Sequence, residues 1–102
     1  MDTKLSFQCE QCNQPNDIEI SSDTFELVGT DPDRGMGTEY AYESSNEFSC
    51  DKCGKDMEIT VQVWEYPIGA YNYHEISKNG IKNLTTDNNF MDVLYEVCQK
   101  NL

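Results

Sequence analysis

One pattern occurs twice in this 102-residue chain, as Phe7-Gln8-Cys9-Glu10-Gln11-Cys12 and as Phe48-Ser49-Cys50-Asp51-Lys52-Cys53. In each copy an aromatic residue stands two positions before a Cys-x-x-Cys pair. A tight turn with this spacing points two thiolates at one ion, and two such turns complete the tetrahedral set of four thiolates that suits zinc. The sequence therefore predicts one structural zinc ion, held by Cys9, Cys12, Cys50 and Cys53.

Both copies continue in the same way, with a short polar turn and then a run of β-type residues, Ile18-Glu19-Ile20 and Met57-Glu58-Ile59. A strand, a cysteine turn and a returning strand, used twice around one metal, resemble a zinc ribbon over about residues 5–63. Gly54 follows the second pair, as in that family, whereas the first pair has Asn13, which tolerates left-handed backbone better than other non-glycine residues. The resemblance implies the four cysteine ligands but no particular function, because zinc ribbons serve many.

Iron is the less favoured metal. The cysteine turns also resemble those of rubredoxins, which are small acidic iron proteins, but the proline expected in the second turn and the glycine expected in the first are absent. Disulfides are not expected, because the first residues contain no apolar signal-peptide segment and cytosolic thiols are kept reduced. We therefore expect a cytoplasmic protein with zinc as its cofactor.

The alternation of apolar and polar residues predicts a mostly antiparallel sheet. Residues 57–77 alternate on both sides of Pro67-Ile68-Gly69, which predicts a β-hairpin. Residues 17–28 predict one long strand or two short ones. The segment 29–37 contains three glycines and one proline, and it predicts an exposed loop.

A helix is predicted near the C-terminal end, where residues 88–100 carry an apolar stripe and Thr85-Thr86-Asp87 can cap the first turn. The expected fold class is α+β, a mostly antiparallel sheet built on the zinc-ribbon-like site with the C-terminal helix packed on it. We expect a single domain over 1–102. Its acidic ribbon-like part covers about 5–66, and 67–102 supply the rest of the hairpin and the helix.

The charge is strongly negative and unevenly distributed. The chain carries a net charge of −12, and residues 1–66 hold fifteen acidic and four basic residues, which gives −11 for this part alone. Direct nucleic-acid binding is not expected, because phosphate contacts require clusters of Lys and Arg. A membrane role is not expected either, because no apolar run approaches the roughly 20 residues of a spanning helix.

Catalysis is not expected. His74 is the single histidine, and no nucleophile motif accompanies it. Cys98 falls on the apolar stripe of the predicted helix, so we expect a buried core residue rather than a ligand or nucleophile. Four thiolates leave no open metal position for a reacting water.

The acidity favours a basic protein as partner, because complementary charge accelerates association. In size and acidity the chain is similar to bacterial immunity proteins and antitoxins, which implies a partner such as a nuclease-type toxin. Three alternatives stay open: a phage or bacterial DNA-mimic inhibitor, an accessory ribbon module contacting the transcription or RNA machinery, and a rubredoxin-like electron carrier. The predicted partner surface consists of Glu39, Glu43, Glu47, Glu58, Trp64, Glu65, Tyr66, Tyr71 and Tyr73.

Overall fold

The computed structural model describes residues 1–35 and 37–100, apart from the side chains of residues 33 and 34. Its elements in chain order are β1 (Asp2–Cys9), β2 (Pro15–Ser21), the 3-10 turn η1 (Ser22–Thr24), β3 (Glu26–Arg34), β4 (Gly37–Ser49), β5 (Asp56–Glu65), β6 (Tyr71–Asn79), β7 (Ile81–Thr86) and α1 (Phe90–Gln99). The strands pair antiparallel in two sheets, with orders β2-β1-β7 and β3-β4-β5-β6. The predicted α+β class, with mostly antiparallel strands and one C-terminal helix, is confirmed.

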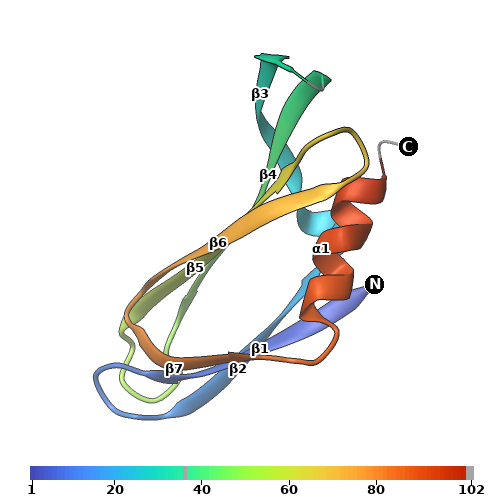
Figure 1. Cartoon of the computed structure of the whole chain (residues 1–102). Coiled ribbons are helices and arrows are strands. Elements are labelled where there is room, and N and C mark those ends of the chain that lie inside the picture. The colour runs from blue at the N-terminus through green and yellow to red at the C-terminus, as the bar shows by residue number, and fades with distance from the viewer. Residues whose placement is uncertain (36, 101–102) are drawn as a thin grey trace.

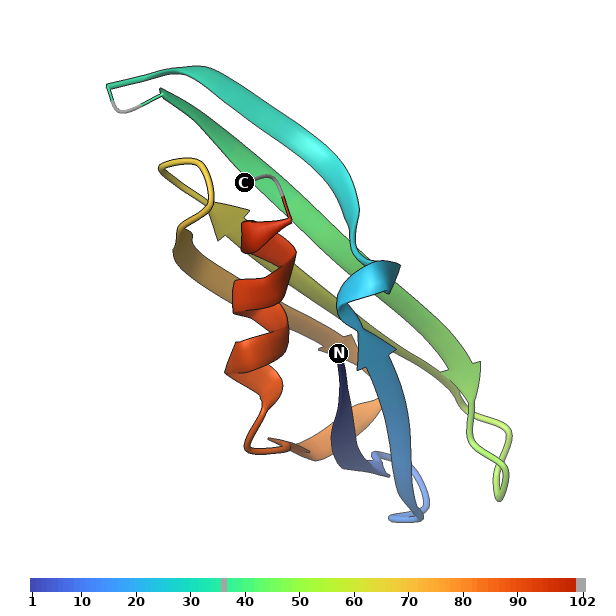
Figure 2. The same ribbon diagram turned by 90° about the vertical axis from the view of Figure 1, so that its right-hand side faces the viewer.

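The two sheets form a wedge with α1 in its open end. Figure 1 shows the sheets converging where the β1–β2 and β4–β5 turns lie and diverging toward the helix. One core cluster combines apolar side chains of both sheets with those of α1. The apolar alternation of β5 fits this arrangement, because Met57, Ile59, Val61 and Val63 all point into the cluster. The face of β3-β4-β5-β6 that is opposite this core is left without a covering layer among the described residues (Figure 2).

Polar contacts fix the C-terminal half of α1 to η1 and to the amino group of Met1. Glu96 accepts a hydrogen bond from the Ser22 hydroxyl and pairs with the Met1 amino group at 3.2 Å. Lys100 Nζ lies 2.6 Å from Asp23 Oδ1. These contacts join α1 to η1, the short turn through which the chain passes from one sheet to the other. No helix in the described part of the chain is long and apolar enough to cross a membrane.

The helix begins differently from the prediction. Thr85 and Thr86 belong to β7, a strand that the sequence pattern did not indicate, and the N-cap residue is Asn89. The Asn89 side chain makes no cap hydrogen bond; instead Oδ1 accepts from Thr3 Oγ1 at 2.8 Å, and Nδ2 donates to the Asp2 carbonyl at 2.7 Å. Asn89 therefore fastens the helix start to β1, and tertiary contact replaces local capping.

Residues 17–28 form two strands, β2 and β3, in different sheets. The expectation of an exposed loop over 29–37 is wrong in its larger part, because β3 continues to residue 34 and β4 begins at residue 37; residue 36 lies outside the described residues. β3 is an edge strand, where Pro32 is tolerated, and its pairing with β4 shifts register at two places that accommodate the turn-forming residues.

Gly80 connects β6 of one sheet to β7 of the other, and replacing it tests how this connection is built. Its φ is +80°, and an added Cβ would lie 2.7 Å from the Asp56 carbonyl oxygen. We predict that Gly80→Ala lowers the free energy of unfolding by roughly 2 kcal/mol or more, through strain and backbone overlap. Gly35→Ala is the control, because a Cβ at Gly35 meets nothing within 4 Å. Urea denaturation of the parent protein and both variants measures the free energy of unfolding. Equal losses of stability in the two variants would contradict this account of Gly80.

Candidate metal centre

The four predicted ligands come together at the narrow end of the wedge. Cys9 is the last residue of β1, and Cys12 lies in the turn before β2. Cys50 directly follows β4, and Cys53 lies in the turn before β5. Their Sγ atoms all lie within 4.8 Å of one another, although the two hairpins belong to different sheets. The four cysteines can therefore hold a metal ion that joins the two sheets.

Both turns have the same backbone structure. In the first, Cys9 N–H donates to the Gln14 carbonyl and Asn13 N–H to the Cys9 carbonyl, each at 2.9 Å. In the second, Cys50 N–H donates to Lys55 and Gly54 N–H to Cys50, again at 2.9 Å. Asn13 and Gly54 have φ of 64° and 75°, the left-handed conformation that suits these residue types. The sequence repeat is thus a repeat of structure.

The aromatic residues of the repeat also meet. Phe7 and Phe48 each precede a cysteine pair by two positions, and their ring centroids lie 5.3 Å apart. Phe7 is buried and Phe48 half-buried, so the contact places an apolar layer directly beside the sulfur atoms. The contact therefore joins the two hairpins next to the four cysteines.

The sulfur spacing fits tetrahedral coordination. Cys9 Sγ lies 3.6 Å from Cys53 Sγ, and Cys12 Sγ lies 3.5 Å from Cys50 Sγ. Metal–sulfur bonds of about 2.3 Å in a tetrahedron place the sulfur atoms about 3.8 Å apart. Four thiolates in this geometry are the ligand set of structural zinc and of iron–sulfur proteins. Among the described residues, the four cysteines are the one group of this kind.

Backbone amides of the turns stabilise the thiolates. The N–H of Cys53 is the main cause that lowers the pKa of Cys50 to about 6, and the N–H of Cys12 lowers the pKa of Cys9 in the same way. The N–H of Lys55 lowers the pKa of Cys53, but burial and hydrogen bonds to the other sulfur atoms outweigh it and raise the pKa to about 12. Metal binding requires the cysteines as thiolates, so a bound divalent cation would displace protons from the sulfur atoms.

The remaining cysteine and the histidine have structural surroundings. Cys98 is fully buried, and burial together with the negative charge of Glu65 raises its pKa to about 12, so its thiol is protonated at neutral pH. The prediction of a core residue is confirmed. His74 Nδ1 lies 2.7 Å from the Tyr71 hydroxyl, and its ring contacts Phe90 edge-on at 5.6 Å. The contact with Phe90 packs β6 against α1.

The structure divides the predicted partner surface. By cross-strand register, six of its members lie on the solvent-facing side of β3-β4-β5-β6, which we call the outer face: Glu39, Glu43, Glu47, Glu58, Trp64 and Tyr73. The same register adds Glu26, Asp31, Asp56 and Glu75, which the sequence reasoning missed. The alternation of β5 and β6 already places Asp56 on the same face as Glu58 and Glu75 on the same face as Tyr73. Glu26 and Asp31 come beside them only through the pairing of β3 with β4, which sequence periodicity does not show. Among the side chains that the structure describes, the outer face carries no Lys or Arg.

Three members lie elsewhere. The prediction that Glu65 is part of a surface is wrong: the side chain is fully buried, accepting from the Tyr42 hydroxyl and the Gly69 N–H, both at 2.7 Å. The period of two that places Val63 in the core places Glu65 there too. Tyr71 lies on the inner side, with its ring 5.3 Å from that of Tyr95, and Tyr66 lies in the β5–β6 connection.

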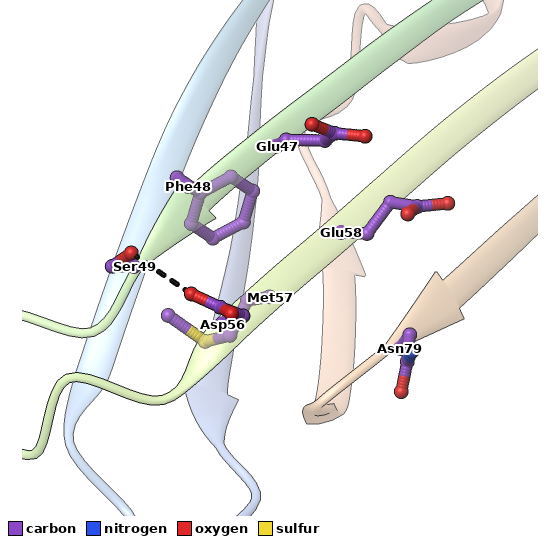
Figure 3. Close-up of a pocket in the computed structure, with 7 residues that line it drawn as sticks. All are labelled: Glu47, Phe48, Ser49, Asp56, Met57, Glu58 and Asn79. Atoms are coloured by element: carbon purple, nitrogen blue, oxygen red, sulfur yellow. Dashed lines mark hydrogen bonds between the residues drawn. The ribbon is translucent and has the colours of Figure 1, made fainter.

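An open pocket lies at the metal-proximal end of the outer face (Figure 3). Glu47 on β4 and Glu58 on β5 are direct cross-strand neighbours, and Asp56 accepts a hydrogen bond from Ser49 Oγ at 3.3 Å. Like charges in directly opposite positions of a sheet are destabilising. The pocket is completed by Phe48, Met57 and Asn79. Its three carboxylates make it suited to a positively charged group.

Comparison with protein-family models finds none that matches this chain, and searches of curated proteins and of solved structures find no similar chain. The site is therefore interpreted from its own geometry and chemistry.

Replacing one ligand tests the metal centre. We predict that Cys50→Ser loses the ion and lowers the free energy of unfolding by roughly 4 kcal/mol or more, because structural metal binding contributes directly to folding. Cys98→Ala is the control, which removes a buried thiol but retains the ion. Native mass spectrometry measures the bound metal, and a colourless protein distinguishes zinc from iron. A Cys50→Ser protein as stable as the parent would contradict a structural role.

Proposed function

We propose that this protein is a non-enzymatic interaction protein, braced by one zinc ion, that binds a basic protein partner through its outer face. The observation that supports the proposal is the charge of that face. Eight carboxylates lie on one side of a single sheet, those of Glu26, Asp31, Glu39, Glu43, Glu47, Asp56, Glu58 and Glu75. Two ion pairs, Met1 with Glu96 and Lys100 with Asp23, lie away from this face.

The arrangement has a cost in stability that a partner would relieve. Glu26 lies opposite Glu43, and Glu47 lies opposite Glu58. Each like-charge pair costs on the order of 0.2–1 kcal/mol relative to a neutral pair. A partner with Lys and Arg side chains at the matching positions would turn this repulsion into attraction, and it would also raise the association rate by roughly 10- to 1,000-fold at low salt.

Nuclease-type toxins are the partner class that we propose. Proteins that act on nucleic acids carry Lys and Arg where the phosphate backbone docks, and a sheet face lined with carboxylates is complementary to such a surface in charge. A bound acidic protein of this kind would block the nucleic-acid site by covering it. In this function the metal has no chemical step to perform; it holds the two hairpins, and thus β4 and β5 of the outer face, in place.

Reversing one charge on the outer face tests the proposal. We predict that Glu47→Lys weakens the complex with the basic partner at least tenfold, because a carboxylate that attracts the partner becomes a cation that repels it. The new lysine lies opposite Glu58, so the fold gains a favourable cross-strand pair. Asp17→Lys on β2 makes the same change in net charge away from the face. Isothermal titration calorimetry at increasing salt concentration measures the affinity of both variants for the basic partner.

Equal weakening by the two substitutions would show that net charge rather than the outer face determines binding. An affinity independent of salt would contradict an electrostatic complex altogether.

A further inference from the structure

The outer face carries a stacked aromatic pair among its carboxylates. Trp64 on β5 and Tyr73 on β6 are direct cross-strand neighbours, with ring centroids 4.4 Å apart and planes within 3° of parallel. This separation is close to the spacing of about 4.8 Å between neighbouring strands, so the normals of both rings run across the strands. Tyr73, which is 43% exposed, therefore covers one face of Trp64, and the other face is turned toward β4.

Only small residues stand beside that second face. The residue directly opposite Trp64 on β4 is Ala41, and Gly29 follows on β3. A Cβ at Gly29 would lie 3.8 Å from the Ala41 Cβ, so these two residues are neighbours. Because neither has a large side chain, the surface beside the indole ring is shallow. Neither can cover the ring of a tryptophan. One face of Trp64 is thus left for a planar group that arrives from outside.

Two carboxylates border this position. Glu39 and Glu43 stand two residues before and after Ala41, and thus on the same side of β4. Glu39 Oε2 accepts from Asn72 Nδ2, and Glu43 Oε2 accepts from Gln62 Nε2, each at 3.3 Å. Both partners are neutral amides, which orient the carboxylates without cancelling their charge. We call Glu39, Ala41, Glu43 and Trp64 the Trp64 site.

We propose that the Trp64 site binds an arginine side chain of the basic partner. The inference rests on the proposed function and deepens it by naming the residue type that the partner inserts. A guanidinium is flat, stacks on an indole face, and offers five N–H donors that can reach carboxylates on two sides. A lysine ammonium is compact and strongly hydrated, so it profits from the charge but not from the ring.

Tryptophan fluorescence tests this directly, because Trp64 is the single tryptophan of the chain. The probes are two short peptides of equal length and charge, one containing Arg-Ala repeats and the other Lys-Ala repeats. At low salt we expect both to bind, the arginine peptide about three- to tenfold more tightly and with a larger change in Trp64 emission. Ala41→Leu should reduce the two affinities to the same value, because the leucine covers the ring without changing any charge.

Ser77→Leu is the matched control, since it adds a leucine to the same face on β6, away from Trp64. Ala41→Val replaces Ala41→Leu if circular dichroism shows that the latter does not fold. Equal binding of the two peptides to the parent protein would overturn the arginine assignment and leave the proposed function standing. No binding of either peptide would overturn both. An arginine preference that survives in Ala41→Leu, or is lost in Ser77→Leu, would overturn the location.

Discussion

The convergence of four thiolates at the narrow end of the wedge is the constraint on which the rest of the structure depends. Cys9 and Cys12 belong to a hairpin of one sheet, and Cys50 and Cys53 to a hairpin of the other. A metal ion bound there would close the end opposite α1, and the core between the sheets would be held from both sides. The backbone turns already present N–H groups to the sulfur atoms, so the site is preorganised for thiolates.

A metal link between the sheets matters because the hydrophobic core is modest and charge repulsion opposes folding. Only 37% of the residues are apolar, and the chain carries a net charge of −12. A compact state with such a charge repels itself, and the cross-strand neighbours Glu47 and Glu58 add a local contribution beside the second cysteine turn. In the proposed function these two properties belong together: the metal supplies stability, and the stable sheet then displays a charge pattern that a basic partner can match.

Much of the site was predictable from the sequence, because its determinants are local. The spacing of Cys50 and Cys53, the left-handed residue that follows each pair, and the alternation through β5 all lie within short segments. The distribution of strands between two sheets was not predictable, since it depends on contacts between distant residues. β3 tolerates Pro32 because it lies at the edge of its sheet. The composition of the segment does not show which strands will lie at an edge. Glu65 is instructive in another way: its place in the alternation already indicated burial, and its charge argued against it. The structure resolves the conflict with hydrogen bonds from Tyr42 and Gly69.

Hydrogen–deuterium exchange before and after removal of the metal by a chelator tests the central claim most directly. The account predicts that amides of β1 and β5, which lie in different sheets, lose protection together once the metal is removed, because the tie between the sheets is lost. Faster exchange confined to residues 10–14 and 51–55, with both sheets still protected, would show that the metal orders only its own turns and would contradict the account.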